Sequence, residues 1–249
     1  MDVLLFLGVF VLGFATMFFG AISGGVGLVT RPILILMGFP ASTVIASSRV
    51  AGIGGELPSV YLLNKNHKVD WSIVWFLVIP MTIGSVLASL AVVTILNANI
   101  DKILGALLLI VGVFFLFKNN IGMKESKNKF SKTKANIIGF LGTVPISFFG
   151  TITGGLGPVY SFFYIWVYGK SFISASAIWR IAANISSIFS AAIFIISGVV
   201  DWMLCISLML GFMLGGYFGT KHGLKQGEQW VRYIVLIITF AGAIKLLFF

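Results

Sequence analysis

The sequence predicts an all-α, polytopic integral membrane bundle, and composition is the first reason. Of 249 residues, 59% are hydrophobic and only 10% are charged, and the mean hydropathy is +1.07. Soluble domains are nearer 45–50% apolar and about 25% charged, so a water-soluble fold is excluded. One membrane span needs about 20 apolar residues. Long stretches without any charge lie at residues 3–30, 71–100, 135–169, 181–200 and 202–220.

The basic character of the chain is concentrated in one segment. Formal net charge is +10, and the lysine-rich segment 118–134 supplies half of that excess. Positive loops orient membrane proteins by staying on the cytoplasmic side. We therefore expect 118–134 to be a cytoplasmic linker, and we expect a lipid bilayer rather than nucleic acid as the partner of the chain.

The sequence contains no motif for binding a cofactor and no set of metal ligands. Cys205 is the only cysteine, which excludes a disulfide framework and a metal-thiolate cluster. His67 and His222 have no acidic or cysteine partner at ligand spacing. No hydrolase motif is present, so we expect neither an enzyme nor a bound cofactor or metal. The apolar run from Val3 follows no basic segment, and we expect the first helix of the mature protein there rather than a cleaved signal.

Self-similarity predicts a tandem duplication. GAISGGVG at residues 20–27 returns as GTITGGLG at 150–157, an offset of 130 residues. Arg49 and Arg180 match at an offset of 131, each with an alanine three residues before it and another two residues after it. Further matches at that offset are Asp70-Trp71 with Asp201-Trp202 and Gly84 with Gly215.

Each half is expected to hold four principal helices, eight in all. The first repeat is 1–117, the second is 135–249, and the linker 118–134 joins them. The first region of each half is too long for one span at 1.5 Å per residue, which predicts a break or a re-entrant piece at the glycines. The expected helical regions are 3–38, 41–63, 70–96 and 101–117, then 135–169, 172–198, 201–220 and 229–248.

The lysines outside the linker bear on the direction of the two repeats. Lys170, Lys221 and Lys225 fall on the cytoplasmic side only if the glycine-broken region crosses twice. Each half then crosses the membrane an odd number of times, which makes the repeats inverted. We favour inverted repeats; an even number of crossings would make them parallel.

Two arginines are the strongest candidates for chemistry. Charges inside a membrane are costly and are functional candidates by default. Arg49 and Arg180 hold equivalent positions, and a guanidinium presents five fixed donors suited to an oxyanion. The alternative is structural, with each arginine paired to a carbonyl or to Glu56, or extended to the interface. The polar neighbours expected to help bind the anion are Ser47, Ser48 and Asn184.

The glycine segments are the second candidate for anion contact. Glycine lets the backbone leave helical geometry, and a helix that restarts there points free N–H groups at a ligand. The alternative is close helix packing through small residues, to which we also assign Gly211, Gly215 and Gly219. The residues expected to contact the anion are Ser23, Gly24, Gly25, Gly27, Thr153, Gly154, Gly155 and Gly157.

Glu56 is the one carboxylate outside the loops and helix entrances. It follows Arg49 by seven residues on one predicted helix, which places both near the same face. Two roles fit it, counter-ion to an arginine or proton carrier. The equivalent position in the second repeat is Ser187, so either role is asymmetric. Asp70 and Asp201 are expected to cap the helices that follow them, with Trp71 and Trp202 at the interface.

Taken in order, these motifs resemble the sulfite exporter TauE/SafE family, also described as toluene sulfonate uptake permeases. The likeness rests on the two glycine segments, on Gly38-Phe39-Pro40 before Ala46-Ser47-Ser48, and on the Asp-Trp entrances. It covers essentially the whole chain. The resemblance implies a duplicated carrier for sulfite and organosulfonates in the plasma membrane, linked to protons or to the membrane potential. It also implies that the glycine turns, Ser47 and Ser48 line the path.

The chain departs from the family at the arginines. Where the family commonly has a Thr-Ser pair, this sequence has Ser47-Ser48-Arg49 and Ile178-Trp179-Arg180. Trp179 is expected to shrink or reshape the site. Our interpretation is a multi-pass secondary transporter that moves small anions by alternating access, coupled to protons in one version. The alternatives are an anion channel, or a membrane-embedded enzyme or assembly factor. The glycine faces permit a homodimer without requiring one.

Overall fold

The computed structural model describes residues 2–66, 69–94 and 130–226, apart from the side chains of Ser23 and Asn66. The described part is helical, as predicted. Five of its helices are long and apolar enough to cross a membrane. These are α1 (Val3–Ser23), α5 (Trp71–Thr94), α7 (Lys132–Thr153), α9 (Phe172–Ile196) and α10 (Trp202–Gln226). The predicted helices 101–117 and 229–248, and most of the linker 118–134, lie outside the described residues.

Four shorter helices complete the described chain, and two of them form hairpins with long ones. They are α2 (Val26–Leu36), α3 (Ala41–Gly55), α4 (Leu57–Asn66) and α8 (Gly157–Tyr168). The α1–α2 turn uses Gly24 and Gly25, whose φ values of 81° and 83° favour glycine. Thr30 then donates a 2.9 Å hydrogen bond back to Thr16, so α2 returns along α1.

The second hairpin is built in the same way. Gly154, with φ 64°, ends α7, and α8 returns along it with the hydroxyls of Thr143 and Tyr164 3.0 Å apart. Both glycine-broken regions therefore enter the bundle and return to the end where they began. The prediction of broken, re-entrant segments is confirmed.

The predicted helix 41–63 is wrong as a single helix. It is interrupted at Glu56, which lies between α3 and α4. Pro58 removes a backbone donor in the first turn of α4, and Gly52, Gly54 and Gly55 weaken the end of α3. Glu56 therefore does not share one continuous helix with Arg49, whereas the corresponding helix α9 is unbroken.

The two halves of the chain interlock. Helix α1 packs in parallel with α10, where Gly211, Gly215 and Gly219 lie against the backbone of Phe10, Phe14 and Phe18. Helix α5 packs in parallel with α7, where Gly84 lies against Val144 and Ser147 donates a 2.7 Å bond to the Met81 carbonyl. The packing role of the α10 glycines is confirmed, and because α1 covers this face it is not a surface for a second copy.

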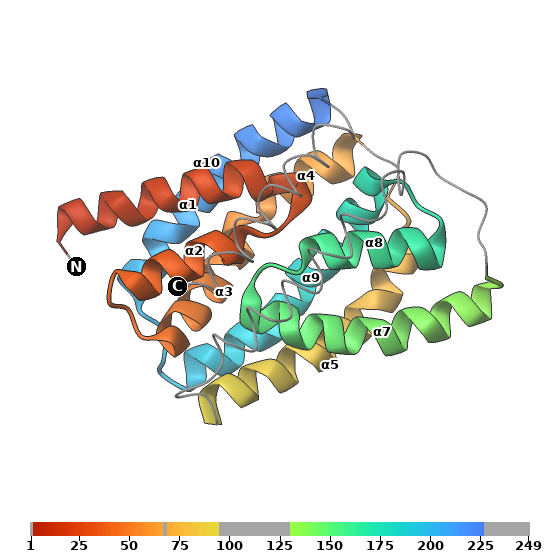
Figure 1. The fold of residues 1–249 in the computed structure, drawn as a ribbon, viewed down its shortest axis with the longest axis horizontal. Coiled ribbons are helices and arrows are strands. Elements are labelled where there is room, and N and C mark those ends of the chain that lie inside the picture. The colour runs from red at the N-terminus through yellow and green to blue at the C-terminus, as the bar shows by residue number, and fades with distance from the viewer. Residues whose placement is uncertain (1, 67–68, 95–129, 227–249) are drawn as a thin grey trace.

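Figure 1 shows the direction of each helix along the long axis of the bundle. Helices α1 and α10 run one way, and α5, α7 and α9 run the other, so α1 is antiparallel to its counterpart α7. Helices α5, α7 and α9 begin at one end of the bundle, and α4 and α10 finish there. We call it the lysine end, after the lysines that lie at it. The lysines of this end are Lys65, Lys132, Lys134, Lys170, Lys221 and Lys225.

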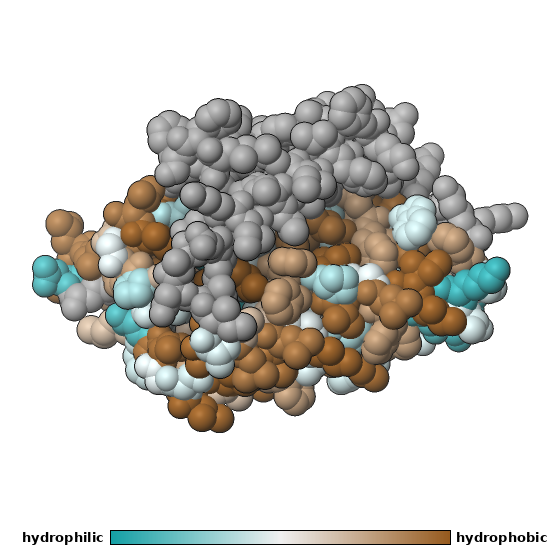
Figure 2. Space-filling view, turned by 60° about the horizontal axis from the view of Figure 1, so that its bottom comes forward, coloured by the Kyte–Doolittle hydropathy of each residue, from teal (hydrophilic) through white to brown (hydrophobic). Residues whose placement is uncertain are grey.

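The helix entrances and the outer surface fit a membrane setting. Asp201 accepts a 3.0 Å hydrogen bond from the Leu204 amide, and Asp70 accepts a longer one from Ile73, so the predicted caps are present. Trp71 and Trp202 are exposed beside them. Figure 2 shows apolar side chains spread over much of the described surface of one face, where a soluble protein would be polar.

The two glycine turns meet at the centre of the bundle. The Gly27 amide donates a 2.9 Å hydrogen bond to the Gly154 carbonyl. A Cβ atom on Gly24 would lie 2.6 Å from the Gly157 Cα, and one on Gly27 would lie 2.5 Å from the Gly154 Cα. The backbones touch directly, so no side chain fits between them.

Gly27→Ala is expected to destabilise the bundle by about 1–3 kcal/mol, because the new methyl group must push the Gly154 backbone away. Gly8→Ala is the matched control: Gly8 is also helical, and a Cβ there meets nothing within 4 Å. The thermal midpoint of the purified chain in detergent measures both. Equal midpoints for the two variants would contradict the backbone contact.

Candidate functional site

A cavity of about 70 Å³ lies beside the meeting point of the glycine turns. Both hairpins contribute backbone to its wall, through Gly24 and Gly25 on one side and Gly154 and Gly157 on the other. Arg49, Glu56 and Arg180 supply its charged groups. The structure thus brings together seven of the predicted site residues in what we call the central cavity.

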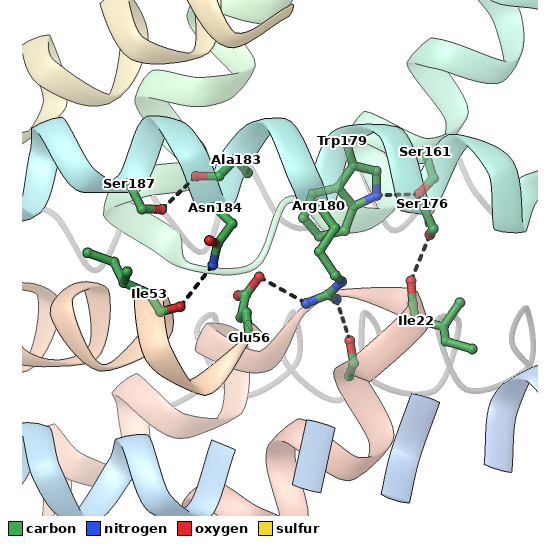
Figure 3. Close-up of polar contacts among 11 residues, drawn as sticks. Ile22, Ile53, Glu56, Ser161, Ser176, Trp179, Arg180, Ala183, Asn184 and Ser187 are labelled. Atoms are coloured by element: carbon green, nitrogen blue, oxygen red, sulfur yellow. Dashed lines mark hydrogen bonds and ion pairs between the residues drawn. The ribbon is translucent and has the colours of Figure 1, made fainter. Parts of the chain in front are cut away.

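Arg180 is the most buried charge of the central cavity, at 1% exposure. Its Nη2 donates a 2.9 Å hydrogen bond to the Gly20 carbonyl, and its Nη1 lies 3.2 Å from the Glu56 carboxylate. Figure 3 shows this guanidinium reaching from α9 toward both partners. Glu56 is 27% exposed, so one member of the pair stays accessible from the cavity.

Aromatic rings cover the other side of Arg180. The Trp179 ring lies 4.8 Å from the guanidinium carbon and stacks on Tyr160 at 5.6 Å. Trp179 also donates a 2.9 Å hydrogen bond to Ser161, which fixes the ring (Figure 3). The expectation that Trp179 shapes the site agrees with its position in the cavity wall.

Arg49 is half-buried and enters the cavity from α3. Its Nε donates a 2.9 Å hydrogen bond to the Ser190 hydroxyl of α9. A second cavity, also of about 70 Å³, lies beside the first, and Arg49, Glu56 and Ser187 line both. Gly27 and Ser48 line the second cavity rather than the first.

Other predicted site residues have structural contacts instead. The Ser47 hydroxyl accepts from the Asp201 amide at 2.9 Å, and the Thr153 hydroxyl accepts from Gly155 at 3.2 Å. Asn184 donates to the Ile53 carbonyl at 3.1 Å. Within the described residues, neither cavity is lined by any of the predicted site residues Ser47, Thr153, Gly155 and Asn184. The side chain of Ser23 lies outside the described residues.

The backbone N–H groups are also less available than predicted. The Gly27 amide is bonded to Gly154, and the Leu28 amide is bonded to Gly25 at 3.0 Å. The start of α2 therefore directs these two amide hydrogens at protein carbonyls. In this conformation the guanidinium groups, rather than the helix start, are the donors that an anion would meet.

Sequence reasoning did not include Arg31 in the site. Arg31 is 6% exposed and reaches from α2 to the end of α7, where it donates to the carbonyls of Thr151 (2.8 Å) and Ile152. Its Nε donates to Ser48 at 3.1 Å. It is one of the few charges in an apolar region, which is the signal that could have found it. Its repeat equivalent at an offset of 130 is Ser161, so recurrence between the halves does not point to it.

The electrostatic balance of the two cavities is positive. Three guanidinium groups line them, and Glu56 is the one carboxylate among their described wall residues. No group of three potential metal ligands occurs in the described ranges, and the cavities offer nitrogen donors where a metal would need acceptors. The arrangement suits a small anion.

Glu56→Gln is expected to lower the free energy of unfolding by about 2–3 kcal/mol, because it leaves the Arg180 charge buried without its partner. Adding Arg180→Met to Glu56→Gln should cost less than the sum of the single changes. SDS titration in mixed micelles measures the cycle. Lys170→Gln, which breaks the more exposed Lys170–Asp70 pair, is the control and should cost under about 1 kcal/mol. Additive single effects would argue against coupling.

Comparisons with known proteins agree with this architecture. The family model described as Sulfite exporter TauE/SafE matches residues 9–246. A probable membrane transporter protein of Haemophilus influenzae is 30% identical over 96% of this chain and 93% of its own length. The probable membrane transporter protein YfcA of Escherichia coli is 24% identical over 93% of this chain and 85% of its own.

No solved structure matches the chain. The match to the family model nevertheless extends through both glycine turns, both cavity arginines and the interlocked helices that hold them. Charged side chains around a cavity inside a bundle of apolar helices typically mark the path of a transported solute. The chain is a multi-pass membrane transporter that belongs to the TauE/SafE sulfite exporter family.

Proposed function

We propose that the protein is a secondary transporter that binds a small anion in the central cavity and moves it by alternating access. The observation that carries the proposal is the placement of Arg49 and Arg180 on opposite helices of one cavity, at the contact between the glycine turns. Guanidinium groups bind oxyanions through paired, charge-assisted hydrogen bonds. The plasma membrane is the proposed location, with the lysine end on the cytoplasmic side.

The size and wall of the cavity favour a small substrate. A volume of about 70 Å³ in this conformation fits an ion of a few heavy atoms better than an aryl sulfonate. The stacked Trp179 and Tyr160 rings occupy space that a larger organic group would need. We therefore propose sulfite or a related inorganic sulfur oxyanion as substrate, in keeping with the description of the family.

Glu56 gives the site an internal competitor for the substrate. Its carboxylate already occupies Arg180 Nη1, so an arriving oxyanion competes with it for the same donor. Once displaced, the carboxylate lies in a confined cavity, where taking up a proton relieves its charge. This exchange is the proposed route by which proton movement accompanies anion movement.

Inverted repeats supply the proposed means of switching sides. Two observations are what such repeats produce. Helix α1 is antiparallel to its counterpart α7, and the first helix of each half packs against a helix of the other half, α1 on α10 and α7 on α5. The equivalents differ in one contact. Arg49 Nε is bonded to Ser190. Their equivalents at an offset of 131, Arg180 Nε and the Ser59 hydroxyl, are both buried and have no hydrogen-bond partner among the described residues. We propose that the opposite-facing state forms the Arg180–Ser59 contact and releases Arg49–Ser190.

Transport is tested with labelled sulfite and proteoliposomes that contain the full chain, with and without a pH gradient. Arg49→Gln and Arg180→Gln should each lower the initial rate by at least about tenfold, since each removes a charged donor from the anion. Lys221→Gln, which removes one charge from the exposed end of α10, should transport normally. Saturation and counterflow distinguish a carrier from a channel. Normal transport by both arginine variants would sink the proposal.

The switching contact is tested with Ser190→Ala and Ser59→Ala. A cysteine in place of Ser186, in the cavity wall, reports which side is open through labelling by an impermeant maleimide, with Cys205 replaced throughout. The two variants should shift the labelling ratio in opposite directions by up to about tenfold, because each removes a bond from a different state. Shifts in the same direction would contradict the exchange.

A further inference from the structure

The second cavity is distinct from the central cavity although the two share a wall. Arg49 and Glu56 line both, but Arg31, Thr30, Ser48 and Gly52 line only the second. Its volume is also about 70 Å³. It therefore has its own guanidinium, Arg31, as the central cavity has Arg180.

The walls of the two cavities correspond through the repeat offsets. At 130 or 131 residues, Met17, Thr30, Ser48 and Gly52 of the second cavity match Ser147, Tyr160, Trp179 and Ala183 of the central cavity. The second cavity is thus the equivalent of the central cavity on the side of the first half. Where the central cavity has a pair of aromatic rings, the second has two hydroxyl-bearing residues beside a guanidinium.

The charge on Arg31 is balanced less completely than the charge on Arg180. The ion pairs within the described ranges are Lys170–Asp70 and Arg180–Glu56, so Arg31 has no carboxylate there. Its hydrogen-bond partners are Ser48 and two carbonyls at the end of α7, which are neutral. An enclosed cation without an anionic partner is costly, and a bound anion removes much of that cost.

We propose that the second cavity is an additional binding position for a small inorganic anion, held between Arg31 and Arg49. The proposal rests on the proposed function for its setting, and it adds that one chain binds two anions at adjacent positions. The second anion is either another substrate oxyanion or chloride, since both present the same compact negative charge. Arg49 contacts both positions and so couples their occupancy.

Gly52→Leu is the sharpest test, because it fills the second cavity alone. A Cβ on Gly52 meets nothing within 4 Å, so the side chain enters open space, and the change favours helix α3. Gly8→Leu is the matched control, since Gly8 is a helical glycine with equally open space and lies away from both cavities.

Calorimetric titration of the purified full chain with sodium sulfite in chloride-free buffer counts the positions. The wild type and Gly8→Leu should bind two equivalents, and Gly52→Leu should bind one with its dissociation constant changed by less than about threefold. If chloride fills the second position, one equivalent of chloride binds instead and Gly52→Leu removes it. The proposal is overturned if the wild type binds only one anion in total, counting sulfite and chloride together. It is also overturned if Gly52→Leu binds as many anions as the wild type.

Arg31→Gln and Arg31→Lys provide an independent measurement. Arg31→Gln should lose the second equivalent, whereas Arg31→Lys, which keeps the charge, should retain it with roughly tenfold weaker binding. Helicity and elution volume establish that each variant is folded. Two equivalents bound by folded Arg31→Gln would contradict the role of Arg31.

The outcome is separable from the proposed function. Sulfite transport by a wild type that binds only one anion would leave the transporter intact and remove the second position. Chloride binding that Gly52→Leu abolishes, in a chain that does not transport sulfite, would keep the second position and overturn the proposed substrate.

Discussion

Direct contact between backbones at the two glycine turns is the constraint on which the rest of the structure depends. Gly24 lies against Gly157 and Gly27 lies against Gly154, with an amide-to-carbonyl hydrogen bond between the latter two. The contact brings the ends of α1 and α7 and the starts of α2 and α8 to one place. A charged cavity can exist there because the glycines of the two turns have no side chains to fill the space. The arginines reach the centre from α2, α3 and α9 instead.

Those arginines also answer a backbone requirement. The last carbonyls of a helix have no partner inside the helix, and in an apolar bundle water does not supply one. Arg180 and Ser176 bond to the carbonyls of Gly20 and Ile22 at the end of α1. Arg31 does the same at the end of α7. The structural and anion-binding interpretations of these side chains are therefore compatible, because each guanidinium has more than one donor.

Much of the fold could be predicted from the sequence, because hydrophobic length and glycine breaks are local signals. The helical class, the broken segments and the Asp201 cap follow from composition and spacing. The break at Glu56 was missed since three glycines and Pro58 only weaken a helix, and tertiary contacts decide whether it continues.

The wall of the candidate site was predicted in part, for a related physical reason. Arg49, Arg180 and the turn glycines were found because they recur in both halves. Arg31, Tyr160 and Trp179 have equivalents of a different type, so recurrence could not place Arg31 or Tyr160 at the cavity. Ser47 lies two residues before Arg49 and Asn184 lies one turn after Arg180, yet their side chains bond to backbone partners elsewhere. Sequence proximity does not fix the direction of a side chain.

The contacts of Arg180 have a mechanical consequence. One guanidinium joins three segments, since it belongs to α9, bonds to the end of α1 and pairs with Glu56 at the junction of α3 and α4. Separating α9 from α1 breaks a buried bond to a charged group, which costs roughly 1.5–3 kcal/mol. This cost opposes the separation of α9 from α1, and the ion pair adds a second tie between α9 and the single-residue interruption at Glu56.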